Sequence, residues 1–282
     1  MPPAMSRTSG TRPVAGAEWR ESVRGLVRHR DLLWQMVATD LRGRYVGSAL
    51  GLFWSVLHPL VLITIYTLVF SRVMRARLPG ASGTYDYSVY LCAGLLPWTA
   101  FQEIVTRSTT VFFEHADLVK QVAFPKTILH GAVVGAAAVN LAIMLLVLLG
   151  FLLLIDYPVR WPLVLWPLFI VLQLAFAAGL GLGASVLNVF FRDTAQIVGV
   201  LFQFWFWLTP LVYPAAVVPE WFSRWLVLNP LYHFTRIHQD LLLSGRLPGL
   251  GETVALSALA VVALSAGLIA FERLKRRIPD EL

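Results

Sequence analysis

The chain is poor in charged side chains, since Asp, Glu, Lys and Arg make up only 14% of its 282 residues. It also has a single cysteine, Cys92, which excludes a disulfide within the chain and stands in an apolar run where it serves as a small packing residue. No Gly-x-x-x-x-Gly-Lys-Ser/Thr sequence occurs, and none of the three lysines follows a glycine. Without a P-loop the chain cannot hold nucleotide phosphates in that way, so any ATP must be bound by a partner and we expect no cofactor here.

What the chain has in abundance is apolar sequence, with 57% hydrophobic residues and a mean hydropathy of +0.69. Such values are far from those of a soluble domain, and about 20 apolar residues in a helix cross a bilayer. We predict six spanning helices, at residues 50–70, 88–106, 128–155, 162–187, 195–212 and 254–271. The expected fold is an all-α integral membrane bundle over 31–271, preceded by a cytoplasmic segment, 1–30, and followed by a basic cytoplasmic tail, 272–282.

The basic residues predict the orientation of this bundle. An even number of spans places both termini on one side, and sixteen of the 23 Lys and Arg residues fall on that side. Cytoplasmic loops are enriched in Lys and Arg, so both termini are expected in the cytoplasm. The first 30 residues have no apolar core of about 7 to 15 residues, which argues against a cleavable signal peptide.

An amphipathic helix is expected just before the first span. Leu33, Val37 and Leu41 recur every fourth residue, with polar residues on the other face. This pattern predicts a helix in the headgroup plane, acting either as a plain topogenic anchor or in a mechanical role. Within the first span, His58 precedes Pro59, a pair more typical of a helix kink than of a proton relay.

The loop after the second span predicts a short helix that ends before Pro125. Leu118, Val119 and Val122 make an apolar face, bordered by the polar residues Asp117, Lys120 and Gln121. This face suits a knob that docks in a groove of another protein, although a solvated connector has the same composition.

The fifth span carries a polar and aromatic stripe. Gln196, Gln203, Phe206 or Trp207, and Pro210 follow helical spacing, and amides at membrane depth normally face a bundle interior or a watered cavity. The surrounding aromatic rings could stack on sugars in a conduit or form an interfacial belt. Asp193 is expected to cap this helix at its N-terminus.

The segment between the fifth and sixth spans contains an amphipathic stretch too short to cross. Its bulky residues are Trp221, Phe222 and Trp225, which predict either a re-entrant hairpin or a surface helix. Further on, His233, His238 and Asp240 lie close in sequence, but their spacing is not diagnostic of a metal or acid-base site, and we expect no metal.

Six short motifs in order resemble the permease subunits of type-2 ATP-binding-cassette exporters of lipid-linked polysaccharides such as O-antigen, teichoic acid, capsule and galactan. They are Arg44-Tyr45 with Ser48-Ala-Leu-Gly-Leu-Phe-Trp54 and Pro59; Ala93-Gly-Leu-Leu-Pro-Trp98; 118–126; 187–193; Leu208-Thr-Pro-Leu-Val-Tyr-Pro214; and Asn229-Pro-Leu231. Val46, Gly47 and His130 depart from the family pattern and affect only local helix geometry.

The resemblance implies roles for these residues. An ATPase-coupling interface would comprise Asp117, Leu118, Val119, Lys120, Gln121, Phe124, Arg42 and Arg44. A substrate conduit would be lined by Trp54, Ser55, His58, Gln196, Gln203, Phe206 and Trp207, and an outer gate by Trp221, Phe222 and Trp225. Two copies of this chain would assemble with two copies of the ATPase in the bacterial inner membrane, without nucleic acid.

The sequence therefore favours a transporter permease that moves a lipid-linked glycan outward and is not itself an enzyme. A drug or haem exporter of the same type is the alternative within transport. An embedded glycosyl- or acyltransferase is the alternative of another class, and only the set from His233 to Asp240 offers it a site.

Overall fold

The computed structural model describes residues 25, 27–44, 48, 50–74, 78–79, 83–121, 124–275 and 277–281. Every regular element in these ranges is a helix. The helices are α2 (Arg30–Gly43), η1 (Gly51–Phe53), α3 (Trp54–Tyr66), η2 (Thr67–Val73), α4 (Asp86–Glu114), α5 (Ala116–Gln121), α6 (Thr127–Leu154), η3 (Trp161–Leu165), α7 (Trp166–Phe190), α8 (Thr194–Leu208), η4 (Ala215–Val217), α9 (Glu220–Leu226), α10 (Pro230–Leu243), α11 (Leu250–Leu274) and α12 (Ile278–Glu281). Most of the predicted segment 1–30, the residues Tyr45, Val46, Gly47 and Val122, and the side chain of Gln121 lie outside the described residues.

Four of the six predicted spans are confirmed as helices long and apolar enough to cross a membrane. They are Trp54–Val73, Thr127–Leu154, Trp161–Phe190 and Leu250–Leu274. The predicted fifth span is an apolar helix of 15 residues, α8, which stops at Leu208 instead of continuing to 212. The predicted second span, α4, has 29 residues but carries four charged side chains, one at each end and two in its second half. Helix length and composition thus establish a multi-pass membrane protein without fixing the number of crossings at six.

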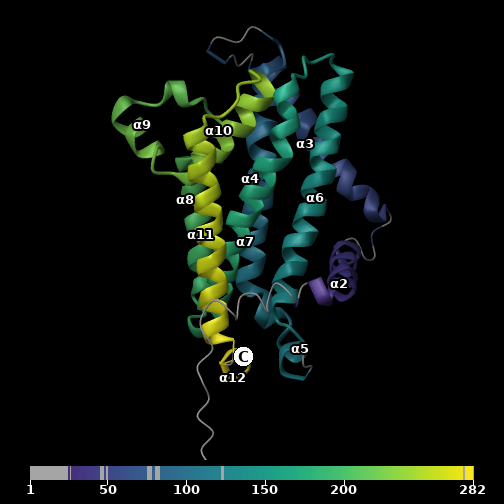
Figure 1. The fold of residues 1–282 in the computed structure, drawn as a ribbon. Helices are drawn as coiled ribbons and strands as arrows, with labels where there is room; N and C mark the ends of the chain where they lie inside the picture. The colour runs from purple at the N-terminus through teal and green to yellow at the C-terminus, as the bar shows by residue number, and fades with distance from the viewer. Residues whose placement is uncertain are drawn as a thin grey trace, which may run out of the picture.

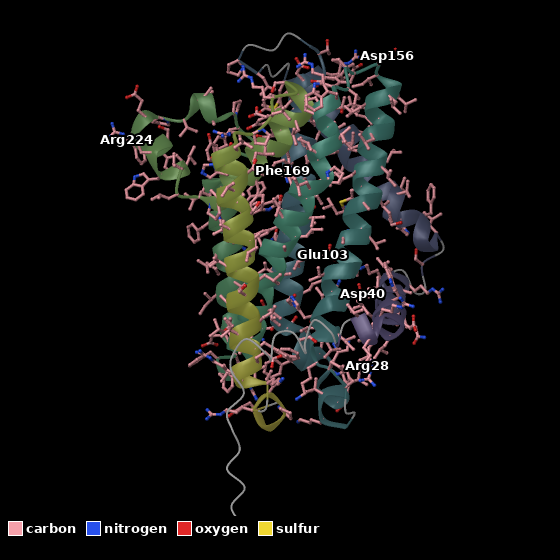
Figure 2. All side chains as sticks on the ribbon, viewed as in Figure 1. Arg28, Asp40, Glu103, Asp156, Phe169 and Arg224 are labelled. Carbon is pink, nitrogen blue, oxygen red and sulfur yellow. The ribbon has the colours of Figure 1, made fainter. Side chains whose placement is uncertain are left out.

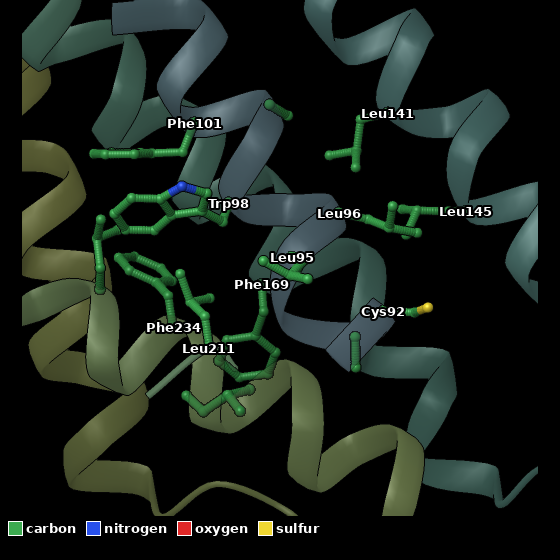
Figure 3. Packing of buried hydrophobic residues seen from close by; sticks show 14 of the residues in the cluster. Cys92, Leu95, Leu96, Trp98, Phe101, Leu141, Leu145, Phe169, Leu211 and Phe234 are labelled. Atoms are coloured by element: carbon green, nitrogen blue, oxygen red, sulfur yellow. The ribbon is translucent and has the colours of Figure 1, made fainter. Parts of the chain in front are cut away.

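Helix α4 occupies the centre of the bundle. Its neighbours are α6, α7 and α10, and 20 of its residues are buried. In Figure 3, Cys92, Leu96 and Phe101 of α4 point into the core beside Leu141 of α6 and Phe234 of α10. A helix that is surrounded by other helices tolerates polar residues that would be too costly on a helix facing lipid.

Helices α7 and α11 pack backbone to backbone at two glycines. A Cβ placed on Gly179 would lie 2.3 Å from the carbonyl carbon of Ala263, and one on Gly267 would lie 2.4 Å from the oxygen of Gly179. Small residues let two membrane helices approach this closely. The pair is thereby fixed as a rigid wall of the bundle.

The predicted amphipathic helix is α2, but its apolar stripe packs against protein. Val37 is only 2% exposed and lies in a cluster with Ala132 and Ala136 of α6, next to Leu33 and Leu41. Figure 1 shows α2 almost end-on beside the upright α6, so the two helices cross steeply. The stripe was expected to face the headgroups, and the structure instead uses it to dock α2 on the bundle.

Candidate coupling surface and transport path

Helix α5 presents its polar residues and one apolar residue outward. Asp117 and Lys120 are exposed, and Leu118 is 42% exposed, whereas Val119 is only 4% exposed. Val119 packs inward in a cluster with Phe112 of α4, and Phe124 packs against the edge of the same cluster. The six-residue helix therefore has one side anchored in the bundle and one side, centred on Leu118, open to a partner.

The C-terminal tail is part of the same cluster. Ile278 of α12 is fully buried in the cluster that contains Val119, and α12 contacts α5. The ammonium of Lys126 donates to the carbonyl oxygen of Lys275 at 3.4 Å. The predicted basic tail is thus packed against the base of α5 over its described residues, and it supports that helix.

Arg44 belongs to a charge cluster between α2 and α4. Figure 2 labels two of its members, Asp40 and Glu103. Arg44 bonds the carboxylate of Asp40 at 3.1 Å and also that of Glu103, while Arg107 bonds both carboxylates, Glu103 at 3.3 Å. Arg42, by contrast, is exposed. The structure therefore gives Arg44 partners within the chain, and leaves Arg42 on the surface.

The cluster alters the acidity of Asp40. Burial alone raises the pKa of this carboxyl, but hydrogen bonds and charges from Arg107 and Arg44 outweigh burial and hold its pKa below the ordinary value of 3.8. The pairs Asp40 with Arg44 and Glu103 with Arg107 are each four residues apart, which is the spacing of ion pairs on a helix. That spacing is the signal that the sequence interpretation overlooked.

On α8, the predicted stripe lies on an exposed face. Gln196 and Gln203 are exposed, and Trp207 is 65% exposed, while Phe206 is half-buried against Trp98 of α4 with ring centroids 5.9 Å apart. Trp98 also contacts Phe202 and Trp205, so it anchors α8 to the centre of the bundle. The amide-bearing face of α8 has no cover within the described part of the chain.

The predicted conduit residues of the first span lie elsewhere. Trp54, 40% exposed, donates its indole N–H to the hydroxyl of Ser48 at 2.8 Å, and His58 is exposed on α3. Ser55 is half-buried next to them. Figure 1 places α3 and α8 on opposite sides of α4, so one chain does not bring the two halves of the predicted conduit together.

The cap of α8 differs from the prediction. Asp193 stands at the N-cap position but makes no side-chain hydrogen bond there. Instead, Asn188 of α7 accepts from the backbone N–H of Ala195 at 3.1 Å, and its amide donates to the carbonyl of Thr109 at 2.9 Å. The buried amide of Asn188 therefore joins α4, α7 and the start of α8.

Beyond α8, an irregular segment, 209–213, is held by side chains of α4. The hydroxyl of Tyr90 donates to the carbonyls of Pro210 and Tyr213 at 2.9 and 2.8 Å, and that of Tyr87 donates to the carbonyl of Val212 at 2.6 Å. Non-helical backbone away from water needs such partners for its polar groups. Tyr87 and Tyr90 are anchors of this segment that the sequence interpretation missed.

Asn229 completes this arrangement from the other side. It accepts from the indole N–H of Trp205 at 2.8 Å and from the N–H of Leu231 at 3.0 Å, where it caps α10. Its amide donates to the hydroxyl of Thr209 at 2.9 Å and to the carbonyl of Leu208 at 3.2 Å. The motifs 208–214 and Asn229-Pro-Leu231 are thus two sides of one hydrogen-bonded joint, which we call the upper joint.

Between the two sides of the joint, the chain makes a lateral excursion. Figure 1 shows α9 projecting sideways from the bundle, and Figure 2 marks its Arg224 at the far edge. Trp221 and Trp225 are 70% and 64% exposed, whereas Phe222 is half-buried beside Trp221, with ring centroids 5.6 Å apart. The predicted gate residues therefore form an aromatic surface on a projecting arm.

The histidines considered for catalysis do not form one site. His238 lies buried between the indole N–H of Trp166 and the amide oxygen of Gln173, at 3.0 and 2.7 Å. His233 contacts the carboxylate of Glu252 at 3.1 Å, on the side of α10 that faces α11. Among the described residues no three His, Cys, Asp or Glu side chains gather as metal ligands. This arrangement removes the site on which the transferase alternative depended.

A bundle of spanning helices with an exposed short helix at one end and a projecting aromatic arm near the other is a multi-pass membrane protein of the transporter kind. Comparison with known proteins agrees. Residues 31–243 match the family model described as ABC-2 type transporter. The chain belongs to that family.

Named relatives extend over nearly the whole chain. The O-antigen export system permease protein RfbA of Myxococcus xanthus is 31% identical over 262 residues, which cover 92% of this chain and 98% of that protein. A protein of the same name from Klebsiella pneumoniae is 31% identical over 89% of this chain and 95% of its own length. The polysialic acid transport protein KpsM of Escherichia coli is 24% identical over 80% of this chain and 85% of its own.

Proposed function

We propose that this chain is the membrane half of an ATP-driven exporter that carries a lipid-linked polysaccharide across the bacterial inner membrane. The observation that carries the proposal is the match to relatives named as O-antigen export permeases over about nine-tenths of the chain. Because the sequence contains no P-loop, the proposal gives ATP hydrolysis to a separate ATPase subunit. The outward face of α5, with Leu118 at its centre, is the surface we assign to that subunit.

The proposed topology has six crossings with both termini in the cytoplasm. Figure 1 shows α5 and α12 at one end of the bundle and α2 on the same half, as an even number of crossings requires. Helix α4 serves as the second crossing because its charged residues Glu103 and Arg107 are neutralised by α2. Helix α8 serves as the fifth crossing and the upper joint completes its passage, while the α9 arm is the proposed outer hairpin between this joint and α10.

The proposed conduit lies between two copies of the chain. Because α3 and α8 stand on opposite sides of α4, His58 and the amides Gln196 and Gln203 can face one path only if a second copy supplies the other wall. In a twofold dimer, each contact between unlike residues of the two copies occurs twice, so α3 of each copy can face α8 of the other. Each permease copy then holds one ATPase subunit, and the aromatic arm of α9 lies near the outer exit.

Depletion of the protein in its host tests the proposed function directly. The surface polysaccharide is resolved by chain length, and the lipid-linked polymer in the cytoplasmic leaflet is measured in the same cells. We expect full-length polymer to accumulate inside and to be lost from the surface. Failure to make any polymer would support a transferase, and normal polymer on both sides would support a drug or haem exporter.

The coupling surface has its own test in Leu118→Asp. A charge at this position enters the docking groove of the ATPase without its solvation, so we expect capture of the ATPase subunit by the purified permease to fall at least tenfold and export to stop. Leu118→Met keeps the apolar contact and serves as the control. Because Leu118 faces outward, the thermal unfolding temperature should be unchanged in both variants. Undiminished capture by Leu118→Asp would contradict the assignment.

A further inference from the structure

The upper end of the bundle contains a cavity of about 790 Å³ that none of the assigned roles uses. Its walls come from the start of α4, the turn between α6 and α7, and α10, and its floor comes from Pro210, Pro214 and the two residues that follow. Figure 2 places one lining residue, Asp156, at the top of the molecule. In the proposed topology, this cavity opens at the outer face of the membrane.

The charges in the cavity balance one another. Its carboxylates are Asp86, Asp156 and Asp240, and its guanidinium groups are Arg160, Arg236 and Arg246. With three charges of each sign, the cavity attracts neither a phosphate nor a cation strongly. A neutral ligand with many hydroxyl groups, which can donate to the carboxylates and accept from the guanidinium groups, fits this lining.

Several of these groups are held in place by the protein itself. The hydroxyl of Tyr157 donates to Asp86 at 2.9 Å, Arg160 bonds the carbonyl of Ser244, and Arg236 bonds Glu252 at 2.7 Å. Polar groups fixed in this way lose little conformational entropy when a ligand binds. The walls of the cavity are therefore preorganised.

Asp240 is the exception, and it supplies a binding group. Its side chain makes no hydrogen bond within the described part of the chain, although it is only partly exposed. Burial raises the pKa of Asp240, and the nearby Arg236 and Arg246 oppose that effect. A half-buried carboxylate that makes no hydrogen bond with the protein can accept two from the hydroxyl groups of a ligand and so recover the solvation that it has lost.

Tyrosine is the other common lining residue. Four tyrosines face the cavity, namely Tyr85, Tyr90, Tyr157 and Tyr232. Their rings offer apolar faces for the C–H surfaces of a sugar, beside hydroxyl groups that hydrogen-bond. We propose that this cavity is an outer saccharide subsite that holds one to three sugar units of the exported polymer through Asp240 and the tyrosine rings.

The subsite lies against the upper joint. Tyr90 lines the cavity and also holds the carbonyls of Pro210 and Tyr213, in the segment from which the α9 arm departs. A sugar in the cavity therefore contacts the base of the arm at the point where the polymer leaves the membrane. This inference rests on the proposed export function, and it adds a site on the outer face.

The test uses the full-length permease in lipid nanodiscs and oligosaccharides of two to six units cleaved from the surface polysaccharide of its host. Binding is measured by saturation-transfer NMR and by calorimetry. Asp240→Asn removes the charge at constant size, and we expect it to weaken oligosaccharide binding at least tenfold. Glu220→Gln, the same chemical change on the exposed α9 outside the cavity, is the control and should bind as the unaltered protein does.

Two results would overturn the subsite. One is the absence of oligosaccharide binding, or equal binding by the unaltered protein and Asp240→Asn. The other is binding of inorganic pyrophosphate that competes with the oligosaccharide, which would make the cavity a headgroup site for the lipid carrier. The depletion experiment separates these failures from failure of the export function, because full-length polymer that accumulates inside and is lost from the surface upholds export whatever Asp240→Asn does.

Discussion

The two ends of α4 hold neighbouring elements in place with opposite chemistry. Toward the lower end, Glu103 and Arg107 exchange charged hydrogen bonds with Asp40 of α2 and with Arg44, the residue that follows α2. At the upper end, Tyr87 and Tyr90 donate uncharged hydrogen bonds to backbone carbonyls of the upper joint. The lower side chains are 19% to 32% exposed, whereas Tyr90 is only 8% exposed.

This difference follows from the cost of burying charge. A charge without water needs a partner of ideal geometry, and even then desolvation cancels most of the attraction. A neutral hydroxyl that donates to a carbonyl has a smaller cost and leaves no unpaired group. Charged bonds among the partly exposed side chains and neutral bonds among the buried ones are therefore each suited to their surroundings.

Removal of the amide at the upper joint should have the largest effect. Asn229→Leu loses the bonds to Trp205, to Thr209 and to the N-terminus of α10 together. We expect a loss of about 3 kcal/mol in the free energy of unfolding, since several buried polar groups lose their partner at once. Thermal unfolding in detergent measures it.

Ser223→Ala on the α9 arm is the matched control for that variant. Its hydroxyl bonds only the carbonyl of Glu220 within the same helix, so its unfolding temperature should be unchanged. Equal unfolding temperatures for Asn229→Leu and Ser223→Ala would show that the upper joint is not a stabilising element.

Removal of the tyrosine hydroxyls of α4 should cause the next largest loss in the free energy of unfolding. Tyr90→Phe leaves the carbonyl of Tyr213 without its partner and weakens the pairing of Pro210, and should cost about 1 to 3 kcal/mol. Tyr87→Phe removes a single bond, to Val212, and should cost less. Both changes keep the ring and its packing. A larger effect for Tyr87→Phe than for Tyr90→Phe in thermal unfolding would contradict the hydrogen-bond assignment.

These residues also show what the sequence could and could not predict. Apolar periodicity predicted four long helices within a few residues of their ends, because burial in lipid dictates length and composition. It ended the second span at 106, whereas α4 continues to Glu114. It could not predict that Tyr90 bonds Pro210, or that Asp40 bonds Arg107, because the partners lie 120 and 67 residues apart. Motif resemblance indicated that the segments 208–214 and 229–231 matter, and only the fold showed that they meet.

The sequence interpretation was also wrong about which residues of α5 share a face. Leu118 and Val119 were assigned to one docking face, but the structure turns Val119 inward against Phe112 and Ile278. Two adjacent apolar residues on a short helix point about 100° apart, and the sequence does not say which one faces the bundle. Ile278 of the C-terminal tail, a segment expected only to be basic and cytoplasmic, packs in the same cluster and covers Val119.

A double-mutant cycle at the lower end sharpens the comparison. Asp40→Asn and Arg107→Gln, alone and together, should give a coupling energy of about 1 kcal/mol, because the pair is partly exposed. The coupling should fall as salt is raised from 0.05 to about 1 M, since salt screens charges that reach water. The cost of Tyr90→Phe should not change over the same range. A coupling energy between Asp40 and Arg107 that does not change with salt would show that this cluster, like the upper joint, is shielded from water.

The smallest effect should appear on acidification. Because the pKa of Asp40 is lower in the folded protein than the ordinary 3.8, its carboxylate stabilises the fold at neutral pH, and this contribution is lost as the pH falls below about 4 through the lowered pKa. The free energies of unfolding of the unaltered protein and of Asp40→Asn should therefore converge as the pH is lowered from 5 to about 3. The difference between the unaltered protein and Tyr90→Phe should stay constant, because no proton binds there in this range. If the unfolding free energies of the unaltered protein and Asp40→Asn diverged on acidification, burial and not Arg107 would dominate the pKa of Asp40.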